Sequence, residues 1–218
     1  MNTLADIILS ERKYFVDTLR KLDSKQWSYS TLCEGWTIAD LAAHLLVRER
    51  GNLVARAGIV LPFLHQFHDK AIARTKLIGK DKLCEKLASP PGWVPRLGFN
   101  CIEFFVHNED LLRGKLQRKR DLDEDLEWAL ASFIPTLARF SLRRIQQPMT
   151  ITLKDTRSYE EYVQHCGKKT SAQVLELEIS GTVGELVLLL NGRGASADIK
   201  LSGSPEALEV FQLSNIGM

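Results

Sequence analysis

The chain has 218 residues, of which 44% are hydrophobic and 26% charged, and its formal net charge is +2. These values are ordinary for a soluble globular protein, and the charge is too small to indicate nucleic acid or an anionic membrane as a partner. No apolar run approaches the roughly 20 residues that span a bilayer. The first residues, MNTLADIILSERKYF, lack a basic-then-apolar signal pattern. We therefore expect a cytoplasmic protein, acting as a monomer or homodimer.

The first two thirds of the sequence show helical periodicity. Residues 3–22 place apolar side chains at three- and four-residue intervals. Thr37 and Asp40 form a capping-box pattern, which predicts a second helix with an apolar stripe after it. A third helix is expected from about residue 61 to 87, with Gly79 as a candidate interruption and SPPGW as its end.

The fourth predicted helix, about 95–113, is apolar over most of its circumference, which indicates a central and buried position. A fifth helix is expected at about 123–146. After Pro148 the period changes to two, and the segments MTITLKD, VLELEIS and ADIKLSG predict half-buried strands. TVGELVLLLNGRG and SPEALEVFQL predict two further short helices. The predicted fold class is α+β, with a helical bundle in residues 1–147 and a small α+β domain in residues 148–218.

Three residues carry the strongest functional signal. Glu103 and His107 lie four residues apart, so a helix places them on one face, with about 5–6 Å between their Cβ atoms. His44, in a separate amphipathic segment, could supply a third metal ligand. Three protein ligands without an evident fourth leave a position open for water or substrate, which is typical of reactive zinc sites. Spacing alone favours a simple polar contact, but a buried Glu103 must be paired, protonated or bound to a cation.

Other polar residues are weaker candidates. Asn100 falls on the same side of its helix as Glu103, and Asp40 and Asp110 lie one turn from a candidate ligand, where they could orient an imidazole or simply cap or solvate a helix. For His65 and His68, a second histidine pair, exposed positions at the start of a helix are the favoured interpretation. The sequence identifies no general base.

The remaining signals favour ordinary structural roles. The four cysteines are scattered without a CxxC pair, which argues against a disulfide framework or an all-thiolate zinc site. Cys33, just ahead of a helix start, is a candidate reactive thiol, although a plain reduced thiol is the favoured interpretation. Trp36 is expected to anchor the loop before His44, and His165 is expected in a polar loop.

Two segments, TLCEGWTIADLAAHLLVRER and EFFVHNEDLLRG, resemble the N-terminal domain of mycothiol-dependent maleylpyruvate isomerases, which belongs to the wider DinB-like metal-binding helical bundles. A third, GTVGELVLLLNGRGASADIKLSGSPEAL, resembles the small sterol-carrier-like α+β domain that follows the bundle in many of these proteins. The likeness extends to an uncharacterised actinobacterial branch described as metal-binding. It implies a DinB-like four-helix bundle with an added helix, followed by that small domain.

The resemblance also implies a site. The metal ligands of the family correspond to His44, Glu103 and His107. Close relatives often have a second histidine directly after the last of these ligands, whereas this chain has Asn108 there. Arg193, in NGRG, becomes a candidate for the edge of the active cleft. The cofactor implied is a divalent metal ion; Zn²⁺ is the first choice, and Ni²⁺, Mn²⁺ or Fe²⁺ also suit two nitrogens and one oxygen.

The function implied is that of a metal-dependent enzyme that uses a low-molecular-weight thiol, such as mycothiol, for S-transfer or isomerisation of a small molecule. Two alternatives stay open from the residues: a metal-dependent hydrolase of a small substrate, and a noncatalytic metal- or ligand-binding module. Basic residues beside the metal would favour the thiol enzyme, because mycothiol is a large polar cosubstrate. A closed coordination sphere would favour the module.

Overall fold

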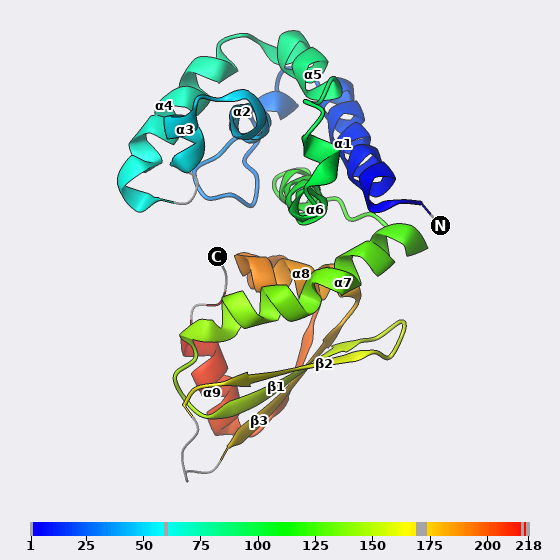
Figure 1. The fold of residues 1–218 in the computed structure, drawn as a ribbon, viewed down its shortest axis with the longest axis vertical. Coiled ribbons are helices and arrows are strands. Elements are labelled where there is room, and N and C mark those ends of the chain that lie inside the picture. The colour runs from blue at the N-terminus through cyan, green and yellow to red at the C-terminus, as the bar shows by residue number, and fades with distance from the viewer. Residues whose placement is uncertain (1, 59–60, 169–173, 215, 217–218) are drawn as a thin grey trace. The chain divides into compact units, whose positions relative to one another are not determined.

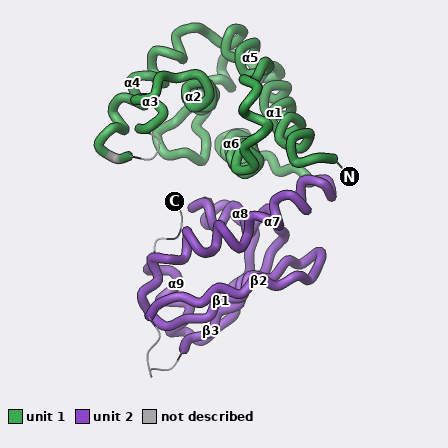
Figure 2. Tube along the Cα trace, viewed as in Figure 1, with its two compact units in different colours: residues 1–121 green, residues 122–218 purple. Residues whose placement is uncertain are grey.

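A computed structural model of the chain describes residues 2–58, 61–168, 174–214 and 216. The chain divides into two compact units, residues 1–121 and residues 122–218 (Figure 2). The first unit is helical and the second combines helices with a four-stranded sheet, so the predicted α+β class is confirmed. Within the described residues, no helix is long and apolar enough to cross a membrane.

The first unit is a bundle of helices (Figure 1). Capping boxes start the first two long helices, with Thr3 bonded to Asp6 and Thr37 bonded to Asp40, the second as predicted. The helix expected from about residue 61 to 87 is interrupted at Gly79, the candidate interruption, and forms two helices; Gly79 lies between them with a φ of +86°, which favours glycine. The elements are α1 (Leu4–Lys21), α2 (Ile38–Arg50), the short α3 (Leu53–Ala57), α4 (His65–Lys76), α5 (Lys80–Ala88) and α6 (Phe99–Arg113).

Helix α6 forms the centre of this unit, as its apolar circumference predicts. It contacts α1 and α2, and most of its residues are buried. Large side chains with almost no exposure fill the core around it, among them Phe15, Leu19, Leu41, Leu45, Phe104 and Phe105. The polar residues of α6 are therefore held in a packed interior, where each needs a partner.

Two buried ion-pair groups also join the helices of the first unit. The guanidinium of Arg12 on α1 pairs with Glu49 on α2, and both side chains are almost fully buried. Arg120, which follows α6, bonds to Glu11 on α1 and to Glu109 on α6. Buried charges are costly unless paired, so these contacts fix how α1, α2 and α6 pack together.

The second unit is a sheet with helices packed on it (Figure 1). The strand order is β2-β1-β3-β4, with β1 and β3 parallel and the outer strands antiparallel to their neighbours. Apolar side chains such as Ile151, Leu153 and Ile179 are fully buried. The elements are α7 (Glu124–Ser141), β1 (Met149–Asp155), β2 (Glu161–Cys166), β3 (Leu175–Gly181), α8 (Val183–Leu188), β4 (Lys200–Gly203) and α9 (Pro205–Leu213).

The boundary between the units lies at residue 121, whereas the change of periodicity in the sequence predicts it at residue 147. The difference is helix α7, which contacts α8 and β2 and so belongs to the second unit. The Ser141 hydroxyl donates to the carbonyl of Leu190, within the same unit. Sequence periodicity identifies α7 as a helix but does not show which neighbours its apolar stripe covers.

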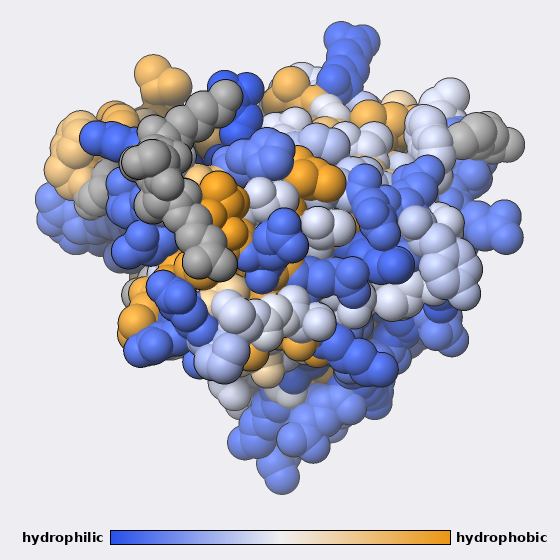
Figure 3. Space-filling model, turned by 90° about the horizontal axis from the view of Figure 1, so that it is seen from below, coloured by the Kyte–Doolittle hydropathy of each residue, from blue (hydrophilic) through white to orange (hydrophobic). Residues whose placement is uncertain are grey.

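Strand β2 is missing from the sequence-based prediction. Its side chains alternate between exposed and half-buried, so no apolar stripe marks it, and His165, expected in a polar loop, lies in it. The molecular face shown in Figure 3 is mostly hydrophilic. Outside the grey atoms, its apolar residues form small groups among polar ones.

The buried Arg12–Glu49 pair yields a stability prediction. We expect Glu49→Ala to lower the free energy of unfolding by about 3–5 kcal/mol, because it leaves Arg12 buried without its counter-charge. The double variant Arg12→Met/Glu49→Met should recover most of this loss, since it removes both charges. Urea unfolding followed by circular dichroism measures both. Equal losses in the single and double variants would contradict the prediction.

Candidate metal centre

Helix α2 carries His44 into the interior of the first unit. The capping box at Thr37 fixes the start of this helix, and its apolar stripe packs into the core. His44 is only 5% exposed, so its imidazole lies inside the bundle and not at the surface.

Three nitrogen groups surround one oxygen of Glu103. Its Oε1 atom lies 3.4 Å from His44 Nε2, 3.2 Å from His107 Nε2 and 3.1 Å from Arg48 Nε. The Glu103 side chain keeps 25% of its exposure, while those of the two histidines keep 10% or less. The structure thus brings together all three residues predicted as metal ligands, and it adds Arg48.

The spacing of these atoms fits a metal site. One ligand atom from each of His44, Glu103 and His107 lies within 4.8 Å of the others. Tetrahedral zinc, with bonds of about 2.0–2.1 Å, places its ligand atoms about 3.3 Å apart. The two nitrogen–oxygen distances of 3.4 Å and 3.2 Å are close to this value. Two imidazoles and a carboxylate are also donors that zinc accepts.

The charges of the cluster are uneven. Burial lowers the pKa of His44 to about 4, although its contact with Glu103 opposes this shift. Burial alone would raise the pKa of Glu103, but its contacts with the two histidines and with Arg48 outweigh it and hold that pKa well below the usual value. Burial opposes a charge on His107 as well, yet the hydrogen bonds to Asp110, Cys33 and Glu103 raise its pKa well above the usual value. Glu103 is therefore ionised and stabilises positive charge beside it.

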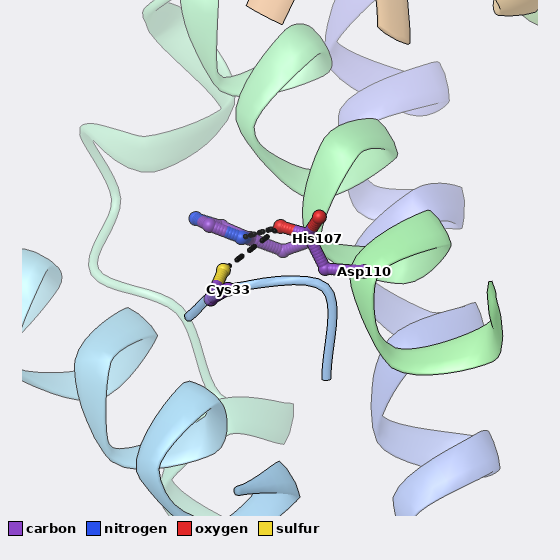
Figure 4. A group of neighbouring side chains, drawn as sticks. All are labelled: Cys33, His107 and Asp110. Carbon is purple, nitrogen blue, oxygen red and sulfur yellow. Dashed lines mark hydrogen bonds and ion pairs between the residues drawn. The ribbon is translucent and has the colours of Figure 1, made fainter. Parts of the chain in front are cut away.

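Asp110 and Cys33 contact the other side of the His107 ring (Figure 4). His107 Nδ1 lies 2.9 Å from Asp110 Oδ2, and the Cys33 thiol donates to the same oxygen at 3.1 Å. The Asp110 carboxylate is fully buried, and its backbone carbonyl accepts from the N–H of Leu32. Asp110 thus holds His107 as expected for a residue that orients a ligand. These three donors form a second group in which a metal ion could be held.

His68 joins the site, contrary to the sequence-based interpretation. His65 is exposed as expected, but His68 is 5% exposed and its Nε2 lies 2.9 Å from His44 Nδ1. His68 Nδ1 lies 3.0 Å from the carbonyl oxygen of Ala55. Trp36 packs against His44, with ring centroids 4.9 Å apart, so its predicted role as an anchor extends to the site itself.

Asn100 holds Arg48 beside Glu103. Its side-chain oxygen accepts from Arg48 Nη1 at 2.6 Å, and its amide nitrogen donates to the carbonyl of Val94 at 2.6 Å. Asn100 is fully buried, so the guanidinium is held by a fixed partner. Arg48 is visible in the sequence one turn after His44, but nothing in the pattern indicates that it reaches Glu103.

Two other candidates have different surroundings. Asp40 bonds to Thr37 and to Lys76 Nζ, the latter at 2.5 Å, so it acts as a cap and ion-pair partner of α2. Arg193 lies in the second unit, where its Nη1 donates to the carbonyl of Asn191 at 2.6 Å. Its assignment to an active cleft therefore stays a prediction.

Comparison with known proteins supports the resemblance. Residues 8–75 match the family model described as the mycothiol maleylpyruvate isomerase N-terminal domain. This segment contains His44 and His68, while Glu103 and His107 lie beyond it. No curated protein matches the sequence.

Two solved structures share the fold. The crystal structure of the mycothiol-dependent maleylpyruvate isomerase matches with a TM-score of 0.62 and 18% identity, over 93% of this chain and 96% of that chain. A histidine-to-alanine mutant of that isomerase matches over the same shares with a TM-score of 0.60 and 17% identity. The resemblance predicted from the sequence is thus confirmed by the family model for the N-terminal segment, and these structures confirm the fold.

The position of Asp40 yields a pH-dependent prediction. Burial opposes its ionisation, but the bonds from Lys76 and Thr37 outweigh burial and lower its pKa below the usual 3.8. The ionised Asp40 therefore stabilises the folded state at pH values above 3.8, and this stabilisation is lost as the pH falls from 3.8 through the lowered pKa of the folded state. We expect Asp40→Asn to cost about 0.5–1 kcal/mol at pH 7 and nothing at strongly acidic pH.

Urea unfolding at several pH values checks this, with Asp69→Asn as the control because Asp69 is an exposed carboxylate on α4. A loss that does not depend on pH would contradict the assignment of Asp40 to the ion pair.

Proposed function

We propose that His44, Glu103 and His107 hold a divalent metal ion, with Zn²⁺ as the first choice, and that the protein is an enzyme that uses a low-molecular-weight thiol on a small molecule. The single observation that supports this most is the cluster of three ligand atoms within 4.8 Å. The likeness of the fold to a mycothiol-dependent maleylpyruvate isomerase suggests mycothiol as the thiol and isomerisation as the reaction.

The residues of the cluster have separate tasks in this proposal. A bound zinc ion would supply a Lewis acid that keeps a thiol in its nucleophilic thiolate form. His44 and His107 would offer their Nε2 atoms, and Glu103 its carboxylate. Asp110 accepts from His107 Nδ1 and so directs the Nε2 atom towards Glu103. Trp36 packs against the His44 ring, which is only 5% exposed to solvent.

Arg48 favours thiol chemistry over the alternatives. Its guanidinium contacts Glu103 and places a fixed positive charge directly beside the proposed metal. Such a charge attracts the anionic groups of a polar thiol or of a carboxylate substrate. A metal-dependent hydrolase also needs a general base that is free to take a proton from water, most often a histidine or a carboxylate. Glu103 would be a ligand in this site, and Asp110 already accepts from both His107 and Cys33.

The metal content of purified protein tests the ligands. We expect the wild type to bind about one Zn²⁺ per chain, and His44→Ala and Glu103→Ala to lose most of it, because two remaining ligands hold zinc weakly. His65→Ala is the matched control, since this histidine on α4 is exposed and belongs to neither of the two groups of candidate ligands. Metal analysis after dialysis gives the answer. Equal metal content in all four proteins would refute the site.

An activity assay tests the reaction. We expect zinc-loaded protein to isomerise maleylpyruvate only when mycothiol is present, and Glu103→Gln to lower kcat/KM by about 100-fold or more, since even residues that merely support ligands are worth 10–100-fold. NMR of the substrate follows the isomerisation, with glutathione as the comparison thiol. Turnover at the same rate without any thiol would instead support the hydrolase or another thiol-independent activity.

A further inference from the structure

We infer that His68 is a positioning residue for His44: through its contact with the Ala55 carbonyl, it fixes which nitrogen of His44 carries the proton. The inference rests on the proposed function in one respect, that His44 is a metal ligand. Its starting point is the Ala55 carbonyl oxygen, which lies 3.0 Å from His68 Nδ1. A carbonyl oxygen can only accept, so His68 Nδ1 must carry a hydrogen and donate it.

The next contact along this chain follows from the first. A neutral imidazole with a hydrogen on Nδ1 has a lone pair on Nε2. His68 Nε2 lies 2.9 Å from His44 Nδ1, which must therefore be the donor. His44 then carries its hydrogen on Nδ1, and the lone pair of its Nε2 faces Glu103 Oε1 at 3.4 Å. Two hydrogen bonds thus set the tautomer that a metal ligand needs.

The contacts of the two ring nitrogens of His68 fit a ring that carries a single hydrogen, on Nδ1. The ring is buried, and none of its hydrogen bonds within the described residues is to a carboxylate that would stabilise a second proton. The His68 and His44 rings meet edge to face, with centroids 5.0 Å apart. The Trp36 ring packs against His44, with ring centroids 4.9 Å apart, and its centroid lies 6.5 Å from that of His68.

The arrangement has a consequence for the site. With its hydrogen on Nδ1, a neutral His44 ring has no hydrogen on Nε2 to donate to Glu103, so the 3.4 Å contact becomes favourable when the ring takes a second proton or when a cation lies between the two atoms. His68 thus leaves the contact between His44 Nε2 and Glu103 Oε1 without a hydrogen bond, and a metal ion held by both atoms would stabilise it. Asp110 acts on His107 in the same manner, at 2.9 Å from Nδ1, so each imidazole has its own partner on the side away from Glu103.

The first experiment measures the tautomer directly in metal-free wild-type protein. Long-range ¹H–¹⁵N NMR at neutral pH distinguishes a protonated ring nitrogen from a bare one, and His44→Ala identifies the signals. We expect His44 to have its proton on Nδ1 and a bare Nε2. A proton on Nε2 with a bare Nδ1 would overturn the inference, and this test needs no variant of His68 and no metal.

The second experiment measures zinc affinity by competition with a chromophoric chelator. We expect His68→Phe, which keeps the ring shape without an acceptor, to bind Zn²⁺ about 10–100-fold more weakly than the wild type. His68→Gln should recover most of the affinity because its side-chain oxygen can accept from His44 Nδ1, and the exposed His65→Gln should bind like the wild type. Circular dichroism and thermal melts check that each variant is folded.

The outcomes separate this inference from the proposed function. Unchanged affinity in His68→Phe, or equal loss in His68→Phe and His68→Gln, would overturn the positioning role. If the wild type binds no zinc although His44 carries its proton on Nδ1, the metal site of the proposed function fails while the hydrogen-bond chain stands.

Discussion

One largely buried carboxylate, that of Glu103, needs positively charged or hydrogen-bonding partners, and this need determines the arrangement of the site in the first unit. Glu103 projects from the central helix α6, and its Oε1 atom contacts nitrogens of His44, His107 and Arg48. Those contacts hold its pKa well below the usual value despite burial. Because a buried negative charge must be balanced, α2 has to approach α6 at the turn that carries His44 and Arg48. The need to balance this charge therefore constrains both the packing of the two helices and the chemistry of the site.

The two imidazoles are supported in different ways. His107 is held by the Asp110 carboxyl group, whose hydrogen bond raises the pKa of His107, whereas the partner of His44 is a second imidazole, that of His68. An anionic partner makes an imidazole more basic and a neutral one does so less. The supports come from three places, α6 itself, the helix α4 and the loop at Cys33, so the site depends on the fold of the whole first unit.

The sequence predicts those parts of the structure that depend on local patterns. The capping box at Thr37 and Asp40, the buried α6 and the shared face of Glu103 and His107 all follow from spacing along one helix. The contact between His68 and His44 does not follow from local spacing, because these residues are 24 positions apart and lie on different helices. Helix α4 also has no strong apolar stripe that would show which of its sides is buried. The same holds for β2, whose residues alternate between exposed and half-buried positions.

The balance of charge around the proposed metal argues for an anionic fourth ligand. In the proposed site, Glu103 and Asp110, both taken as carboxylates, contribute one negative charge each, Arg48 contributes one positive charge, and metal binding requires both imidazoles to be neutral. A divalent ion added to this set leaves one positive charge in excess, in surroundings that are largely buried. A thiolate cancels that excess, whereas a neutral water molecule leaves it uncompensated until it loses a proton. Charges in a low-dielectric interior favour the neutral total, so the cluster is better suited to hold a thiolate than a neutral ligand.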